Sequence, residues 1–300
     1  VPELFPLLRS LCDRSGEAGQ FLVLGSAPPH LLKQTSETLA GRIAYIELAP
    51  FREHELGSDA RGVLWDRGGF PGSYLAPDAE MSRIWLENFM RTFLERDIPQ
   101  LGIRVSALTL RRFWQMCAHY HGECWNHSKI AGSLGVTGTT AGHYLDILEG
   151  AYMLRRLPSF AANVKKRLVK APRVYLRDSG LLHRMLRIDS HDDLLAHPVY
   201  GASWEGYVIE QVAAALPAAD LSYYRTAAGT EMDLVVGLGQ RTVALEMKGT
   251  TAPKLTKGFW TAQEDLRPDR CFVVAPVDAP YPLANGVMVA PPQVVIDEMQ

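Results

Sequence analysis

The stretch Glu231-Met-Asp-Leu-Val-Val-Gly-Leu-Gly-Gln-Arg-Thr-Val-Ala-Leu-Glu-Met-Lys248 decides how the C-terminal part of this chain folds. It contains two short apolar runs rich in β-branched side chains, which favours two strands. The glycine-containing turn at 237–240 separates them, so the pattern predicts a hairpin. Because strand side chains alternate between faces, Glu246 and Lys248 share one face, and the apolar residues next to them pack on the other.

Two carboxylates of this hairpin are candidate metal ligands. Asp233 is expected opposite Glu246 or one place diagonal to it, and cross-strand neighbours lie about 5 Å apart. Carboxylates this close repel each other unless a cation lies between them, and Mg²⁺ prefers oxygen ligands. The pattern therefore predicts that Asp233 and Glu246 bind Mg²⁺ and that Lys248 stabilises developing negative charge. Glu205, on the preceding helix, is a further candidate catalytic carboxylate.

The surrounding segments predict a mixed α/β unit with the order αβββαβ. Helices are expected over 203–216 and 257–266, and strands over 221–224, 232–236, 242–247 and 271–275. The triplet of Asp, Glu and Lys is common by chance, and the element order makes it more specific. In the alternative interpretation, Glu246 and Lys248 form an exposed ion pair on an edge strand and carry no chemistry.

Upstream of this unit, the pattern predicts a winged helix. Helices are expected over 108–121, 128–134 and 139–149, followed by a strand over 153–157. The third helix would read DNA, but it carries Asp146 and Glu149, which DNA would repel. A purely structural winged helix therefore stays an alternative.

A basic segment without acidic residues, 155–173, follows the predicted winged helix. Clustered lysines and arginines neutralise phosphates, so DNA is an expected partner, and a solvated linker is the equal alternative. The basic residues are Arg155, Arg156, Lys165, Lys166, Arg167, Lys170 and Arg173.

The N-terminal part predicts the edge of a parallel α/β sheet. A helix is expected over 3–14, a strand over 20–26, a weak helix over 31–39 and a strand over 43–48. A strongly amphipathic helix is expected over 80–98. At the other end of the chain, an apolar run followed by Asp297-Glu298 predicts a terminal strand with an acidic end.

Length and composition set further limits. Three hundred residues predict two or three domains, and the net charge of −2 means that any nucleic-acid surface must be local. The chain has four cysteines but no CxxC pair, no signal peptide and no apolar run of about 20 residues, so we expect a cytoplasmic protein without membrane spans. The chain begins in the middle of a pattern, so we expect further sequence upstream.

Short motifs along nearly the whole chain carry a family resemblance. Residues 231–248 resemble the PD-(D/E)xK nuclease superfamily, and the chain as a whole resembles prokaryotic AAA-plus ATPases that carry such a restriction-endonuclease-like domain at the C-terminus. The motifs are Val1-Pro-Glu-Leu-Phe-Pro6, Leu24-Gly-Ser26, Leu39-Ala-Gly-Arg42, Leu48-Ala-Pro-Phe51, Gly68-Gly-Phe-Pro71, Leu94-Glu-Arg-Asp-Ile98, Lys166-Arg-Leu-Val-Lys170, Val174-Tyr-Leu-Arg-Asp178, Trp204-Glu205, Glu231-Met-Asp233 and Leu245-Glu-Met-Lys248.

This resemblance implies four domains. They are a remnant of the ATPase core at 1–50, a helical lid at 51–104, a winged helix at 105–165 and a nuclease-like domain at 166–300. It also places Ser26 where a nucleotide-sensing polar residue would lie, and Arg42 where an arginine would contact the nucleotide.

The chain departs from this family at the phosphate loop, because it contains no G-x-x-x-x-G-K-[ST] motif. ATP is therefore an expected cofactor only if a missing N-terminal part supplies that loop. We do not expect these 300 residues alone to hydrolyse ATP.

The resulting hypothesis is an AAA-plus-family protein whose C-terminal domain performs Mg²⁺-dependent hydrolysis of phosphodiesters in DNA. One alternative is a non-catalytic module that binds DNA or a partner protein. Another is an ATPase whose ATP-binding half lies outside this sequence, and a third is an unrelated enzyme on a similar fold. The sequence predicts neither a substrate preference nor an oligomeric state.

Overall fold

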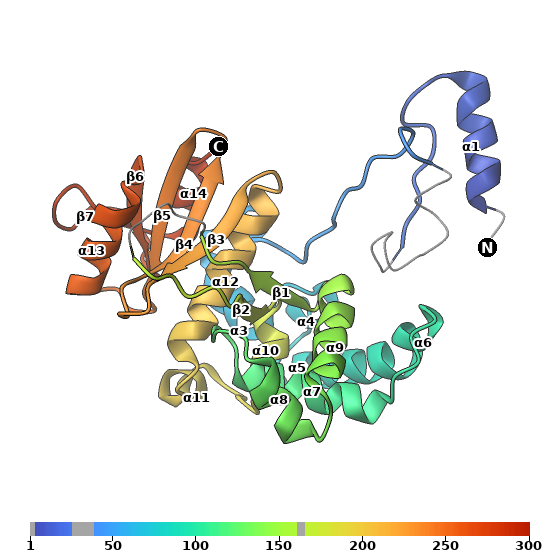
Figure 1. The fold of residues 1–300 in the computed structure, drawn as a ribbon, viewed down its shortest axis with the longest axis horizontal. Helices are drawn as coiled ribbons and strands as arrows, with labels where there is room; N and C mark the ends of the chain where they lie inside the picture. The colour runs from blue at the N-terminus through green and yellow to red at the C-terminus, as the bar shows by residue number, and fades with distance from the viewer. Residues whose placement is uncertain (1–3, 26–38, 161–165) are drawn as a thin grey trace.

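A computed structural model describes residues 4–25, 39–160 and 166–300 of the chain. The described residues form a mixed α/β structure in which helices predominate in the first two thirds and a six-stranded mixed sheet lies in the C-terminal third (Figure 1). No helix among them is long and apolar enough to span a bilayer.

The C-terminal sheet holds the predicted hairpin. β3 to β5 run antiparallel, whereas β5, β6 and β8 run parallel. Leu238 pairs with Arg241, so Gly239 and Gln240 form the turn, and Gly239 adopts the positive φ of 65° that such a turn requires. In spatial order the strands are β3 (Asp220–Arg225), β4 (Glu231–Leu238), β5 (Arg241–Met247), β6 (Arg270–Val274), β8 (Met288–Ala290) and β7 (Tyr281–Pro282).

Helices cover both faces of this sheet (Figure 1). α12 (Tyr200–Ala215) and α14 (Pro292–Asp297) pack on one face, and α13 (Lys257–Leu266) packs on the other. The structure thus has the expected order α12, β3, β4, β5, α13, β6. The terminal strand predicted over 294–300 is wrong, because Pro292 starts a helix there that buries Val295 and Ile296.

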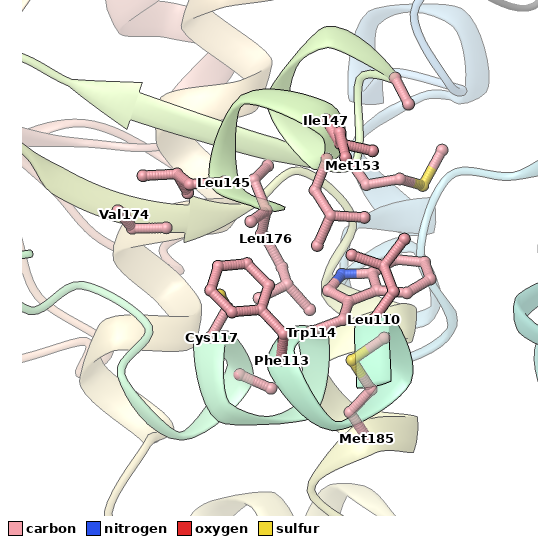
Figure 2. Packing of buried hydrophobic residues seen from close by; sticks show 14 of the residues in the cluster. Leu110, Phe113, Trp114, Cys117, Leu145, Ile147, Met153, Val174, Leu176 and Met185 are labelled. Carbon is pink, nitrogen blue, oxygen red and sulfur yellow. The ribbon is translucent and has the colours of Figure 1, made fainter. Parts of the chain in front are cut away.

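The middle of the chain is a helical unit with its own apolar core. Figure 2 shows side chains of α7, α9 and β2 converging around Trp114 and Phe113, which are fully buried. Its elements are α5 (Ala79–Thr92), the π-helical η2 (Phe93–Asp97), α6 (Ile98–Gln100), α7 (Ala107–His119), α8 (His127–Leu134), α9 (Gly138–Gly150), β1 (Leu154–Leu157), β2 (Arg173–Leu176) and α10 (Ser179–Met185).

A two-stranded antiparallel sheet belongs to this unit, in which Leu154 of β1 pairs with Leu176 of β2. The expected domain boundary at 165/166 therefore falls between two paired strands. The helix predicted over 80–98 extends to residue 100 but passes through a π-helical turn. Pro99 follows that turn and has no N–H to donate to it.

A glycine-rich loop joins α3 (Arg61–Arg67) to α4 (Pro71–Tyr74) and closes on Asp178. The Asp178 carboxylate accepts hydrogen bonds from the N–H groups of Gly69 and Leu181, both at 2.8 Å. A side chain at Gly68, whose φ is 76°, would collide with this carboxylate at 2.2 Å. Burial raises the pKa of Asp178 to about 6, although its backbone donors oppose the shift. The remaining elements are α2 (Glu53–Leu56), η1 (Ser58–Ala60) and α11 (His191–Ala196).

The N-terminal part differs most from the prediction. α1 (Leu4–Ser15) forms as expected, but residues 20–25 and 43–48 form no strands. Both predicted strands are therefore wrong over these residues, because no strand of the described part of the chain pairs with either run. Leu22 and Leu48 are 82% and 94% exposed. The helix predicted over 31–39 lies outside the described residues except for its last position.

Candidate functional site

The carboxyl end of β5 carries Glu246 and, just beyond the strand, Lys248. The ammonium group of Lys248 donates a hydrogen bond to Glu246 Oε1 at 2.6 Å. Glu246 is buried, with 7% of its surface exposed. The expected division of faces is confirmed, because Leu245 and Met247 pack with α12 while Ala244 packs with α13 on the opposite face.

Asp233 reaches the same end of the sheet from β4. The register between β3 and β4 shifts at this point, because Ser222 pairs with Val235 whereas Tyr224 pairs with Met232. Such a bulge turns side chains locally and is frequent next to functional sites. The Asp233 carboxylate accepts a hydrogen bond from the backbone N–H of Met247 at 2.9 Å. Asp233 is thereby held against the segment that carries Glu246 and Lys248.

Glu205 joins this group from the first part of α12. Its Oε1 accepts hydrogen bonds from the hydroxyl of Tyr175 and from the guanidinium of Arg173, the latter at 2.8 Å. The same guanidinium nitrogen lies 3.9 Å from Asp233 Oδ1. The structure therefore brings all four candidate catalytic residues of the C-terminal domain into one connected network.

Arg173, in β2, is a residue of the site that the sequence did not predict as such. The sequence pattern placed it only in the basic segment. Its side chain is 5% exposed and contacts Glu205, Asp233 and Glu231. Its guanidinium also lies 4.8 Å from the centre of the Tyr223 ring. An arginine inside a strand that is otherwise apolar, 173–176, is the local signal that could have marked it as an inward-facing charge.

The charges of this cluster are unequal. Glu205, Asp233 and Glu246 supply three carboxyl groups, whereas Arg173 and Lys248 supply two cations, and Glu231 has Arg225 as a second partner at 3.5 Å. Burial raises the pKa of Glu205 to about 7 and that of Glu246 to about 8, and the charge of Asp233 adds to both shifts.

Lys248 responds to the same neighbours. Burial opposes its charged form, but the carboxylates of Glu246 and Asp233 together raise the pKa of Lys248 above its ordinary value. The lysine is therefore charged at neutral pH. With two cations opposite three carboxyl groups, the cluster retains a proton near neutral pH.

The donor atoms of the cluster suit a hard divalent cation, since they are carboxylate oxygens. Glu246 Oε2 is buried and has no hydrogen-bond partner among the residues that the structure describes. As the side chains stand, no three His, Cys, Asp or Glu residues within 4–25, 39–160 and 166–300 are arranged to hold a metal ion. Arg173 and Lys248 donate to Glu205 Oε1 and Glu246 Oε1, so these two oxygens would reach a metal ion only if those contacts opened.

The two candidate nucleotide-binding residues do not join this cluster. Ser26 lies outside the described residues. Arg42 is exposed, donates to the Asp13 carboxylate and to the carbonyl of Ala40, and contacts no residue of the carboxylate cluster.

Most of the basic segment is neutralised within the protein. Arg155 pairs with Glu210, Arg156 pairs with Asp146 and Glu149, and Lys166 pairs with Asp265 at 2.6 Å. Together with the buried Arg173, these contacts contradict a continuous phosphate-binding stretch over 155–173. Arg167 and Lys170 are exposed and make no ion pair among the described residues, and Lys165 lies outside them.

The predicted reading helix, observed as α9, is also neutralised. Asp146 and Glu149 on this helix share the Arg156 guanidinium, with 2.9 Å between Asp146 Oδ1 and Arg156 Nη1. Thr139 and His143 are exposed on it. The repulsion of DNA expected from the two acids is therefore reduced, but α9 carries no lysine or arginine.

Three family models match successive segments of the chain. Residues 1–57 match the family described as an AAA domain, and residues 63–192 and 200–294 match two domains of unknown function, DUF8612 and DUF4143. The chain is 44% identical over 291 residues to "Uncharacterized protein Mb2031c" of Mycobacterium bovis and to "Uncharacterized protein Rv2008c" of Mycobacterium tuberculosis. The aligned part covers 97% of this chain. No solved structure matches it.

The match at 1–57 shows that the N-terminal residues are similar to the AAA domain family. The chain spans 66% of the length of the curated relatives it matches. Glu205, Asp233, Glu246 and Lys248 lie in the segment that matches DUF4143. Their partners Arg173 and Tyr175 lie in the segment that matches DUF8612.

Proposed function

We propose that the C-terminal α/β unit hydrolyses phosphodiester bonds in DNA with the help of a divalent cation. The observation that carries this proposal is the convergence of Glu205, Asp233, Glu246 and Lys248 at one end of the sheet. The order α12, β3, β4, β5, α13, β6 is the one expected for a restriction-endonuclease-like domain, and it supports the same conclusion.

In this proposal Asp233 and Glu246 hold Mg²⁺. The buried Oε2 atom of Glu246, which lacks a hydrogen-bond partner, supports this role because an unsatisfied buried carboxylate oxygen is costly. When bound, the cation would polarise a phosphoryl oxygen and lower the pKa of a water molecule. The raised pKa of Glu246 means that the cation must displace a proton there, so cation affinity rises with pH.

Lys248 has a different task. Its ammonium group, held 2.6 Å from Glu246 Oε1, stays positioned and charged beside the carboxylates. It can donate to the attacking water or to a phosphate oxygen that gains negative charge. Glu205 supports the site by fixing Arg173 and Tyr175, and Arg173 in turn neutralises Asp233.

The middle unit is proposed to be a winged helix that presents DNA or a partner protein to the C-terminal unit. Three helices, α7, α8 and α9, followed by the β1–β2 sheet, support this assignment. ATP would bind only with a phosphate loop supplied from outside these 300 residues, and Ser26 and Arg42 are the proposed nucleotide contacts. We also propose a cytoplasmic location.

Cleavage of DNA tests this proposal directly. Plasmid and single-stranded DNA are incubated with the full chain while Mg²⁺ or Mn²⁺ is titrated. We expect metal-dependent cleavage that Glu246→Gln reduces by at least about a hundredfold, because the substitution removes a metal ligand. Glu264→Gln, a matched change of an exposed residue on α13, should leave the rate unchanged. Equal rates for the two variants would remove the assignment.

A second candidate function is a non-catalytic one, in which this domain binds DNA or a protein partner for an ATPase. The observation that favours it is the occupation of the carboxylates by Arg173 and Lys248. Isothermal titration of Mn²⁺ into the full chain separates the two functions. Heat of binding that disappears in Glu246→Gln supports the catalytic proposal, and its absence in the unmodified chain supports the non-catalytic one.

A further inference from the structure

Two chain segments meet at the end of the sheet that carries the carboxylate cluster. The first comprises residues 166–170 of the connection from β1 to β2, which lie along the outer edge of β3. Its backbone hydrogen-bonds to that edge, since Val169 N–H donates to Arg225 at 2.9 Å and Ala227 N–H donates to Arg167 at 2.8 Å. Leu168, between them, packs into the apolar core beneath α13. The neighbouring side chains of Arg167 and Lys170 are exposed.

The second segment is the loop that leads from Lys248 into α13. Leu255 anchors this loop in the same apolar core as Leu168. The start of α13 lies against the β3–β4 turn, because a side chain at Gly258 would approach the carbonyl oxygen of Gly229 to 4.0 Å. Lys254 and Lys257, on either side of Leu255, are exposed. The two segments thus present four basic side chains around one turn of the sheet.

These four residues, Arg167, Lys170, Lys254 and Lys257, are here named the basic rim. In the described part of the chain, none of them forms an ion pair. The neighbouring basic residues behave differently, since Lys166 pairs with Asp265, Arg225 pairs with Glu231, and Arg173 is buried among carboxylates. Unpaired cations gathered beside a buried acidic site form a local positive surface on a chain whose net charge is −2.

We propose that the basic rim binds the phosphate backbone of a nucleic-acid strand and guides it to the carboxylate cluster. The proposal rests on the proposed function for the destination of the strand, but the binding itself needs neither metal nor catalysis. Each segment is connected to the cluster. Val169 of the first segment hydrogen-bonds to Arg225, whose partner Glu231 also pairs with Arg173, and Lys248 of the cluster begins the second segment. A phosphate backbone fits this surface because lysine and arginine neutralise phosphates independently of sequence.

Binding of a fluorescently labelled oligonucleotide, followed by anisotropy in EDTA, tests the proposal. The full chain is compared with the double variant Lys254→Glu/Lys257→Glu. The control is Arg241→Glu/Arg270→Glu, which makes the same change of charge at the opposite end of β5 and β6. Each protein is measured with single-stranded and duplex DNA across about 50–200 mM salt.

We expect the rim variant to bind about tenfold more weakly than the unmodified chain. The slope of log affinity against log salt concentration should fall by the amount expected for about two lost phosphate contacts. The affinity of the control should stay within about twofold of that of the unmodified chain. Equal losses in both variants, or no salt-dependent binding by the unmodified chain, would overturn the proposal. The binding experiment contains no metal. If the chain binds DNA in this way but does not cleave it in the metal titration, the nuclease function is contradicted and the binding role of the basic rim is supported.

Discussion

The β4–β5 hairpin and the two runs at 20–25 and 43–48 have similar β-type patterns, but only the hairpin forms strands. Each contains a short run in which aliphatic side chains predominate. In the hairpin Leu245 is fully buried, whereas Leu22 is 82% exposed and forms no strand. The hairpin has a neighbouring strand on both sides of β5 and a helix on each face. The difference teaches that a β-type pattern becomes a strand only where partners supply its hydrogen bonds and cover its side chains.

Among substitutions near the buried hairpin, Arg173→Ala is expected to have the largest effect on stability. Removing this guanidinium leaves Glu205, whose side chain is 15% exposed, without its cationic partner, whereas Glu231 keeps Arg225, so the free energy of unfolding should fall by about 3–5 kcal/mol. Urea unfolding followed by circular dichroism measures the change. Arg42→Ala, which breaks an exposed ion pair with Asp13, should have no measurable effect. Similar losses in the two variants would break the comparison.

A smaller effect is expected from replacing one leucine by alanine in the hairpin and one in the N-terminal run. Leu245→Ala leaves a cavity between β5 and α12 and should lower the free energy of unfolding by about 2–5 kcal/mol. Leu22→Ala should change it by less than about 0.5 kcal/mol, since this side chain is exposed. The same urea experiment compares them. A cost for Leu22→Ala close to that of Leu245→Ala would mean that the N-terminal run is covered in solution.

The smallest expected effect concerns pH. Because the pKa of Glu246 is raised to about 8 in the folded chain, the folded state holds an extra proton above the ordinary pKa of a glutamate. Stability should therefore decline as pH rises from about 4.5 to about 8, and Glu246→Gln should remove about 1–2 kcal/mol of this decline. Unfolding at about pH 5.5 and pH 8.5 measures it. Parallel curves for the variant and the unmodified chain would contradict the raised pKa.

Asp13→Asn is the matched control for this pH experiment. The hydrogen bond from Arg42 lowers the pKa of Asp13, so its contribution to stability is lost only as pH falls below the ordinary value of an aspartate. Between about pH 5.5 and pH 8.5 this residue stays charged in both the folded and unfolded states. The control should therefore show the same pH dependence as the unmodified chain.

The parts of the fold that the sequence predicted are those set by local signals. The Gly239-Gln240 turn and the alternation around Glu246 specify the hairpin within a few residues. α13 was predicted with the bounds that the structure has, because Thr256 caps its first turn and its apolar spacing is regular. The convergence of Asp233 and Glu246 follows from the same hairpin, so this half of the candidate site was accessible from the sequence.

The remaining parts depend on contacts between distant positions. Arg173 meets Glu205 and Glu231 only after the chain has folded, and neither spacing produces a local pattern. The same reason explains why the basic segment appeared free, since the partners of Arg155 and Lys166 lie in α12 and α13. The predicted N-terminal strands failed in the opposite way, because their local pattern was strong but no partner strand is present among the described residues.

The connection between β1 and β2 has a consequence for how the molecule can be divided. By hydrogen-bonding to β3, residues 158–160 and 167–169 shield what would otherwise be an open border of the sheet. A fragment that starts after this connection would keep β3 but expose its backbone groups to other chains. Such a fragment should aggregate by strand addition, so a stable C-terminal unit without the middle helices would need another segment to cover this edge of β3.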